Sequence, residues 1–426
     1  MVRLVPLFLT ALLLTAQTAP PDTKQRVKAV RELAKQGSGS IPKIVPYISD
    51  PQIDVRVEAV KALTDIGTVN SLDPLIKATQ DNDSEVQIRA TDGLVNFYYP
   101  GYVKTGFSAS LRRAGTAIKG KFTDTNDQVI DPYVDVRPEV IRALGQLARG
   151  GSSMESRANA ARAIGVLRGR AAIPDLVAAL HSKDSQVIYE ALIAFEKIRD
   201  VSAGPEFQFL LHDLDERVQT TALEATGMLL NRAAAPDVRD TLQRAHSAKV
   251  RRQALATLAM MPDEANRPLL AQYFNNKDEG LRTAAAEGYA RLKNPADVPQ
   301  LQTAFNAEDK MAPRLALAFA LVDCGKIEIS EFSPLRYLLD TLNSKNYQGV
   351  AVVYLTELAR DPRILRSLYL PARIGTGDEK IELAQVFAAS GDQDTVAQVQ
   401  AISRDPDSDV AQAGLRALRT LKTRYP

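Results

Sequence analysis

The 426-residue sequence contains one cysteine, three histidines and no tryptophan, and each shortage limits the chemistry that the chain can carry. The single cysteine, Cys324, cannot form an intrachain disulfide, so packing alone must hold the fold together. The sequence has no H-E-x-x-H, no G-x-S-x-G, no Walker-type phosphate loop and no paired-cysteine metal motif. We therefore expect no catalytic residue, no cofactor and no metal site, and we predict that the protein is not an enzyme.

Neither sign of charge prevails, because 53 lysines and arginines stand against 51 aspartates and glutamates, for a net charge of +2. A nucleic-acid-binding chain usually has a larger basic excess, so this balance disfavours a nucleic-acid partner. Aromatic residues make up only 6% of the chain, so aliphatic side chains and alanine must fill the core, which suits closely packed helices. The length exceeds what one core usually organises and predicts several domains or one extended repeat array.

The N-terminus, residues 1–19, has the layout of a secretory signal peptide. Arg3 supplies the positive charge, residues 4–14 form a short apolar stretch, and the small residues Ala16 and Ala19 follow. We expect cleavage between these two alanines and an exported protein, either periplasmic or secreted. No later apolar run approaches 18 residues, so we expect the mature chain to be soluble.

One pattern recurs along the chain: valine or leucine, then alanine four residues later, then a large apolar residue after four more. This spacing places the three residues on one face of a helix, and the small middle residue lets a neighbouring helix approach closely. Several steps between successive copies are 31 residues, which predicts a repeat array. The clearest copies are Val55/Ala59/Leu63, Val86/Ala90/Leu94, Ser156/Ala160/Ile164, Val187/Ala191/Phe195, Val218/Ala222/Thr226, Val250/Ala254/Leu258, Leu281/Ala285/Tyr289 and Val410/Gly414/Leu418.

A second helix is predicted ahead of each copy, with a proline in its first turn, where the missing N–H would be unpaired in any case. These prolines are Pro74, Pro174, Pro205, Pro236, Pro268 and Pro299. An acidic residue three places before the repeat valine or leucine is expected to cap the following helix. These caps are Asp83, Asp184, Asp215, Asp278 and Asp407. Each unit is then a helical hairpin that must stack on its neighbours to bury its apolar face.

The spacing D-x-x-V-R-x-x-A-x-x-A-L, preceded by Asp50-Pro51 and again by Asp405-Pro406, resembles HEAT repeats, in particular the short variety named after phycobilisome lyases. With the signal peptide, it is similar to an exported bacterial member of that family. The resemblance implies an all-α fold, a right-handed α-solenoid of about 11–12 hairpins, over residues 20–97 and 137–426. The pattern is less regular after about residue 310, where Ala316, Tyr354 and Leu383 stand at expected helix positions.

An insertion at residues 98–136 interrupts the period, because the copy at Ser156 follows the copy at Val86 by 70 residues, 39 more than one period. Apolar residues at helical spacing between Phe107 and Phe122, with basic residues beside them, predict an amphipathic helix. Either this helix packs back on the solenoid, or its aromatic and basic residues form a docking surface. The candidate partner-binding residues are Tyr98, Tyr99, Tyr102, Lys104, Phe107, Arg112, Arg113, Lys119 and Lys121.

Two other sets of residues have structural interpretations. His181 and His212 stand 31 residues apart, in equivalent places of adjacent repeats, and packed helices about 8–10 Å apart cannot bring them to one zinc ion. The arginines after the repeat valine or leucine are expected to pair with the cap aspartates. These are Arg56, Arg137, Arg251 and Arg282.

Three functions fit the sequence. The first is a non-enzymatic exported scaffold that mediates protein–protein interaction along a concave helical surface. The second is a peripheral membrane or envelope adaptor that acts through the insertion, with an anionic polymer or membrane surface as its partner. The third is a lyase-like enzyme or enzyme subunit, as the family resemblance implies.

Overall fold

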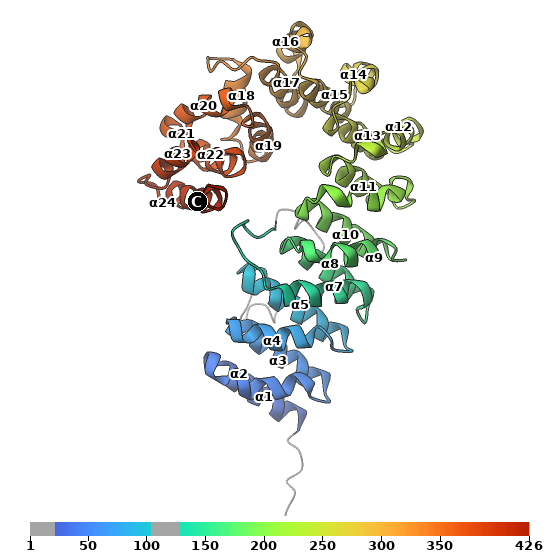
Figure 1. The fold of residues 1–426 in the computed structure, drawn as a ribbon, viewed down its shortest axis with the longest axis vertical. Coiled ribbons are helices and arrows are strands. Elements are labelled where there is room, and N and C mark those ends of the chain that lie inside the picture. The colour runs from blue at the N-terminus through green and yellow to red at the C-terminus, as the bar shows by residue number, and fades with distance from the viewer. Residues whose placement is uncertain (1–21, 104–127, 426) are drawn as a thin grey trace, which may run out of the picture.

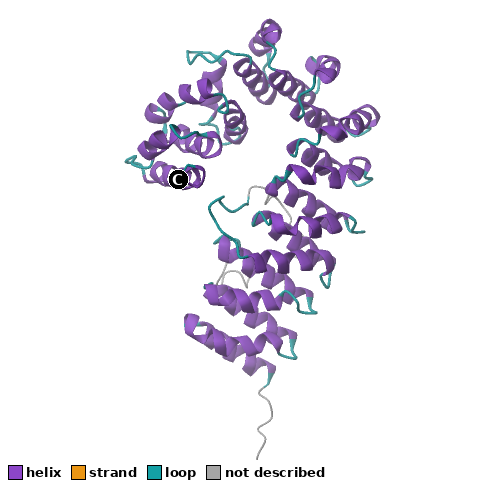
Figure 2. Cartoon of the chain, in the orientation of Figure 1, coloured by secondary structure: helices purple, strands orange, loops and turns teal. Residues whose placement is uncertain are grey.

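The computed structural model of the chain describes residues 22–103 and 128–425, and within these ranges every regular element is a helix (Figure 2). An inner helix, α1, is followed by eleven hairpins, each made of an outer and an inner helix. This confirms the predicted all-α solenoid of about 11–12 hairpins. The inner helices are α1 (Thr23–Ala34), α3 (Ile53–Ile66), α5 (Ser84–Tyr98), α8 (Met154–Val166), α10 (Ser185–Ile198), α11 (Glu216–Met228), α13 (Ala248–Met260), α15 (Glu279–Leu292), α17 (Met311–Asp323), α19 (Gln348–Leu358), α22 (Gly377–Ser390) and α24 (Ser408–Arg424).

The outer members of the hairpins are shorter, and some are split or are 3-10 helices, which are labelled η. They are α2 (Ile41–Ile44) with η2 (Val45–Ser49), α4 (Val69–Ala78), α7 (Pro138–Gly150), α9 (Ile173–Leu180), η5 (Val201–His212), α12 (Ala235–Arg244), α14 (Arg267–Phe274), α16 (Val298–Ala307), α18 (Pro334–Thr341), α20 (Pro362–Ser367) with α21 (Tyr369–Ile374), and α23 (Thr395–Ile402). The hairpins stack into an arch with the inner helices on its concave side (Figure 1). The last hairpins turn back as a hook toward the middle of the chain.

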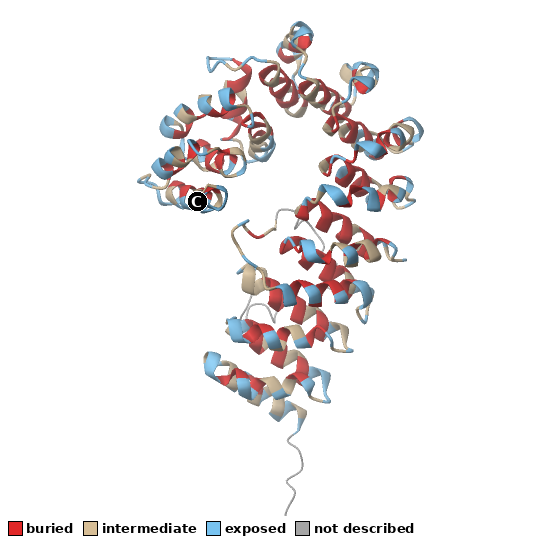
Figure 3. Cartoon of the chain, viewed as in Figure 1, coloured by how far each residue is buried: buried red, intermediate tan, exposed pale blue. Residues whose placement is uncertain are grey.

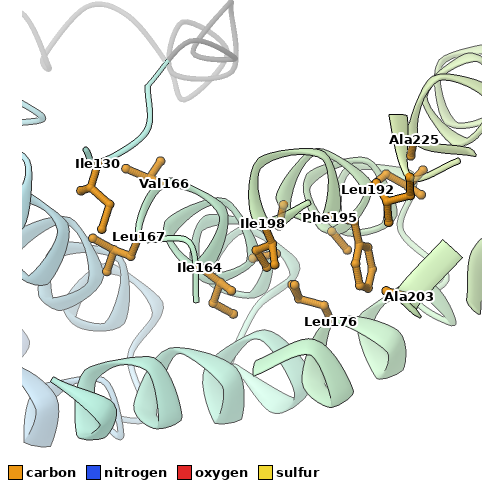
Figure 4. Close-up of a cluster of buried hydrophobic side chains, with 14 of the residues drawn as sticks. Ile130, Ile164, Val166, Leu167, Leu176, Leu192, Phe195, Ile198, Ala203 and Ala225 are labelled. Atoms are coloured by element: carbon orange, nitrogen blue, oxygen red, sulfur yellow. The ribbon is translucent and has the colours of Figure 1, made fainter. Parts of the chain in front are cut away.

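The repeat pattern of the sequence forms the core. Val187, Ala191 and Phe195 of α10 are completely buried, and the other predicted copies are buried in the same way except for the partly exposed Leu418. Leu176 of the outer helix α9 lies among Ile164 of α8 and Phe195 and Ile198 of α10 (Figure 4). The buried side of each inner helix therefore faces an outer helix and its two inner neighbours, and the buried residues follow the inner helices around the arch (Figure 3).

The predicted helix caps are confirmed. The side chain of Asp184 accepts hydrogen bonds from the backbone N–H groups of Gln186 and Val187, and the other four aspartates cap their helices in the same way. Four of the six prolines lie in the first two residues of their helices. For Pro74 and Pro205 the prediction was wrong. Pro74 lies inside α4, which begins five residues earlier, and Pro205 lies inside the 3-10 helix η5.

Several inner helices are followed by a residue in the left-handed conformation. After α3 this residue is Gly67, with φ of 58°, for which the conformation costs little. After α10 it is Arg199 at 57°, and after α15 it is Lys293 at 53°. Side chains other than glycine lose about 1 kcal/mol or more in this conformation, so the packing of the hairpin imposes it.

The part of the array with a weaker sequence pattern is still made of hairpins. Ala316, Tyr354 and Leu383 lie in α17, α19 and α22, and all three are buried. The outer element between α19 and α22 is divided into α20 and α21, which contain Pro362 and Pro371. Pro371 has no N–H to donate, so the backbone hydrogen bonds of this outer element are interrupted there.

The insertion joins α5 to α7. The structure describes its two ends, residues 99–103 and 128–136, which we call the first and second stems. Outside the described residues lie the predicted signal peptide, the expected amphipathic helix and six of the candidate docking residues, so these remain predictions. The six are Lys104, Phe107, Arg112, Arg113, Lys119 and Lys121.

Replacing Ala222 by leucine should lower the free energy of unfolding by about 1–3 kcal/mol. Ala222 is completely buried at the middle position of the repeat pattern in α11, where a larger side chain must displace a neighbouring helix. The matched control is Ala233→Leu, which enlarges an exposed alanine in the turn before α12 and should change little. Urea denaturation followed by circular dichroism measures both, and equal midpoints for the two variants would contradict the assigned register.

Candidate functional site on the concave face

The concave face is formed by the sides of the inner helices that point away from the outer helices. Positions three and six residues after the repeat valine lie toward this side. At three places on this side, hydrogen bonds join one inner helix to another, and twice they join position six of one helix to position three of the next. We call these bonds the concave ladder. Its rungs join Arg31 to Glu58 at 2.8 and 3.1 Å, Asp92 to Asn159 at 3.2 Å, and Arg162 to Glu190 at 3.1 and 2.6 Å.

The most buried rung lies between α8 and α10. The side chains of Arg162 and Glu190 are only 6% and 3% exposed. Burial opposes the charge of the guanidinium, but Glu190 more than compensates and raises the pKa of Arg162 above its ordinary value. Gln186 donates to Glu190 at 2.8 Å and accepts from Arg217 of α11, also at 2.8 Å. The polar chain therefore extends over three consecutive inner helices and fixes their relative positions.

The first stem of the insertion rests on this buried rung. The hydroxyl of Tyr102 lies beside Asp92, Arg162 and Glu190, and burial together with the nearby carboxylate of Asp92 raises the pKa of Tyr102 above its ordinary value. The backbone N–H of Tyr102 donates to the carbonyl of Tyr99 at 3.2 Å. The first stem is therefore folded onto the concave side between α5 and α8.

The other described candidate tyrosines also pack against the array. The hydroxyl of Tyr98 accepts a hydrogen bond of 3.2 Å from the backbone N–H of Arg137, so it joins the two ends of the insertion. Tyr98 and Tyr99 are half-buried and, like Tyr102, contact the hydrophobic core. Sequence spacing could not reveal these contacts, because they join residues on opposite sides of the insertion. The role of the three tyrosines in partner binding stays a prediction.

The second stem connects the middle of the array to its C-terminal hook. Ile130 is buried and its N–H donates to the carbonyl of Val166 at the end of α8, at 2.9 Å (Figure 4). Tyr133 donates to Asp131 at 2.7 Å. Burial and Asp131 raise the pKa of Tyr133, and the guanidinium of Arg419 in α24 opposes them. The last helix thus lies against the second stem and narrows the opening of the arch.

A second polar cluster sets the sharp bend of the arch. Two residues of α15 bind α19. Arg291 donates two hydrogen bonds of 2.9 Å to Glu357 of α19, and Glu287 accepts a hydrogen bond of 2.5 Å from Tyr354 of α19. The ring of Phe319 in α17 stacks on Tyr354, with 4.6 Å between ring centroids. We call these contacts the α15–α19 clasp. Because they pass over the intervening inner helix α17, they hold the hook against the rest of the array.

The arginines that follow the repeat valine make pairs, but not with the cap aspartates as predicted. Arg56 binds Asp81 at 2.7 and 2.9 Å, and the same carboxylate accepts the N–H of the cap residue Asp83. Arg282 pairs with Glu308 beside a pocket of about 360 Å³. Arg137 pairs with Asp73, and Arg251 donates to a backbone carbonyl. Arg56 and Arg282 thus reach acids of the next repeat that are not cap residues, whereas the cap residue Asp278 pairs with Arg252, the residue after Arg251.

The histidines and the cysteine have structural surroundings. His181 stacks on Phe209 with ring centroids 4.9 Å apart, and His212 lies 3.4 Å from the hydroxyl of Thr241. Burial and the neighbouring Asp323 raise the pKa of Cys324 to about 11. Among residues 22–103 and 128–425, no group of three or more histidine, cysteine, aspartate or glutamate side chains could hold a metal ion. None of the helices in these ranges has the length and apolar character needed to cross a membrane.

Stacked helical hairpins with a continuous core and a concave inner face define an α-solenoid. The profile of HEAT repeats matches residues 10–95, 141–227 and 235–322, which together make up more than half of the chain. The chain belongs to the HEAT-repeat family. A search of curated proteins found no match.

The chain is also similar, at low sequence identity, to solved structures. The complex of CpcE and CpcF of phycocyanin lyase from Nostoc sp. PCC7120 is 18% identical with a TM-score of 0.38, and the match covers 63% of this chain and 92% of that one. YibA of Escherichia coli is 14% identical with a TM-score of 0.41, over 72% of this chain and 98% of that one. Importin beta is 12% identical with a TM-score of 0.39, over 96% of this chain and 60% of that one.

Replacing Arg162 by methionine should lower the free energy of unfolding by about 3–5 kcal/mol, because the buried Glu190 loses its charge partner. The matched control is Arg31→Met at the first rung of the ladder, where the arginine side chain is 59% exposed. There the loss should stay below about 1 kcal/mol. Chemical denaturation of the two variants measures the difference, and losses of the same size would show that the middle rung is not a buried pair.

Proposed function

We propose that the protein is a non-enzymatic scaffold that holds another protein against the concave face of its solenoid. The observation that carries this proposal is the concave ladder. Its buried middle rung fixes α8 and α10 in place, and Gln186 and Arg217 extend the bonding to α11. A curved surface with fixed side chains loses little conformational entropy when a partner docks. Repeat arrays of this kind present extended concave surfaces for such contacts.

The environment of the one cysteine supports a non-enzymatic role. A nucleophilic cysteine needs a lowered pKa, which a nearby base or a cationic group provides. Burial and the neighbouring acids shift the pKa of Cys324 in the opposite direction, to about 11. Its thiol lies 3.6 Å from the carbonyl oxygen of Asn294, which is the contact of a packed side chain.

Site-specific photo-crosslinking tests the scaffold proposal. Benzoylphenylalanine at Lys61 of α3 or Gln253 of α13 would lie on the concave side, and at Glu206 of η5 or Thr303 of α16 on the outer side. In extracts of the producing cells, we expect one discrete protein adduct from the concave positions and none from the outer ones. Adducts from the outer positions alone would contradict a concave binding surface.

We also propose that the protein is exported, on the basis of the charged, apolar and small residues in sequence over residues 1–19. Mass spectrometry of the N-terminus tests this. Protein recovered from the cell envelope or the medium should begin between residues 17 and 20. An intact Met1 on that protein would contradict the proposed cleavage.

The basic and aromatic composition of the insertion supports a second function, an adaptor that binds anionic surfaces. Vesicles containing phosphatidylglycerol are the probe, with vesicles of phosphatidylcholine as the neutral control. Replacing Lys104, Arg112, Arg113, Lys119 and Lys121 by glutamine should abolish cosedimentation with the anionic vesicles if the insertion acts in this way. Cosedimentation that the five substitutions leave unchanged would exclude the insertion as the binding element.

A further inference from the structure

Glu196 stands where six other inner helices have an uncharged residue, whereas the last helix, α24, has Arg419 there. Glu196 lies nine residues after the repeat valine of α10, and this position faces the next inner helix. A Cβ added to Gly165, the equivalent residue of α8, would lie 2.8 Å from the Cα of Ala194, which shows how little room the position offers. The equivalent residues in α3, α5, α8, α11, α13 and α15 are Thr64, Val95, Gly165, Gly227, Ala259 and Ala290.

One oxygen of the Glu196 carboxylate is buried without a hydrogen-bond donor. The residue is only 9% exposed, and Oε1 has no hydrogen-bond partner. A buried carboxylate usually has a donor or a countercharge, because loss of hydration disfavours its ionised form. Burial accordingly raises the pKa of Glu196 well above its ordinary value. Nothing in the folding of α10 requires an acid here, since neighbouring repeats fold with glycine or alanine.

A second carboxylate lies beside it on the concave face. Glu224, six residues after the repeat valine of α11, is exposed and close enough to Glu196 to raise the pKa of Glu196 further. The surrounding protein also raises the pKa of Glu224 itself. Lys197 and Arg199, at the end of α10, act in the opposite direction on Glu196. In the concave ladder each acid meets a donor on an adjacent inner helix, but the hydrogen-bonded rungs stop at α10.

We propose that Glu196 and Glu224 form the docking point for a lysine or arginine side chain of the partner protein. This inference rests on the proposed scaffold function and names the chemistry of the partner at one place on the concave face. A cationic side chain bound to the exposed carboxylate of Glu224 would also stabilise the ionised form of Glu196 beside it. Two carboxylates suit one ammonium or guanidinium group, whereas a calcium ion takes six to eight oxygen ligands.

Fluorescence anisotropy with labelled hexa-arginine tests the docking point, and hexa-citrulline is the probe of the same shape without charge. Wild-type protein at low ionic strength should bind hexa-arginine and not hexa-citrulline. Glu196→Gln and Glu224→Gln should each weaken binding, and the double variant should weaken it about tenfold, equivalent to about 1.4 kcal/mol. Glu206→Gln, which removes an exposed charge from the outer element η5, should bind like the wild type.

Proton release gives a second readout that a purely structural Glu196 would not produce. Binding of a cation should ionise the carboxyl group, so calorimetry in two buffers of different ionisation enthalpy should show protons released by the wild type and fewer by Glu196→Gln. Between the ordinary pKa and the raised one, folded protein holds the proton that unfolded protein has lost. The wild type should therefore lose stability as pH rises through this window, and Glu196→Gln should not.

Absence of hexa-arginine binding, or equal binding by the wild type and the double variant, would overturn the docking point. Such a result is distinguishable from failure of the scaffold proposal, because crosslinks from Lys61 and Gln253 report the concave surface independently. Binding of spermidine with the same dependence on Glu196 and Glu224, but no binding of hexa-arginine, would also overturn it in favour of a small-cation site.

Discussion

Close approach between neighbouring inner helices is the constraint on which the rest of this structure depends. A single hairpin cannot bury its own apolar face, so each unit gains stability only by contact with the next. Small residues allow that contact: a Cβ added to Gly227 of α11 would lie 2.7 Å from the sulfur of Met260 and 3.3 Å from the Cα of Thr257 in α13. Helices this close make an unpaired polar side chain between them costly. The packing that stabilises the fold therefore also fixes the positions of the side chains on the concave face.

Pairing on the concave face is the direct consequence. Between α8 and α10, Arg162 meets Glu190 at the matching position of the next helix. At the bend the partner is two inner helices away, since Arg291 and Tyr354 join α15 to α19 over α17. The polar contacts of α15 and α19 and the stacking of Phe319 on Tyr354 thus determine where the arch turns.

What the sequence could predict is local in the chain. The repeat triads and the capping aspartates depend on spacings of three and four residues, and the structure confirms both. Contacts between distant residues could not be predicted: Tyr102 reaches Arg162, and Arg56 binds Asp81 instead of a cap residue. The left-handed ending at Arg199 gave no signal either, because tertiary packing imposes a conformation that its side chain does not favour. At the concave face, the departure of Glu196 from the repeat was visible in the sequence, but its burial was not.

Departures from the period are therefore the informative positions of a repeat array. A residue that follows the period serves the packing that all units share. A charged side chain that is paired within the ladder is already desolvated and hydrogen-bonded in the free protein, so it gains little free energy from contact with a partner. Glu196 differs on both counts, and Glu224 differs on the second. At the place of Glu196, alanine or glycine would spare α10 the desolvation of a carboxylate. A buried acid at this place lowers the stability of the free protein by the cost of its desolvation. Binding of a cationic side chain would offset part of that cost. A scaffold can achieve selectivity by this means without moving its backbone.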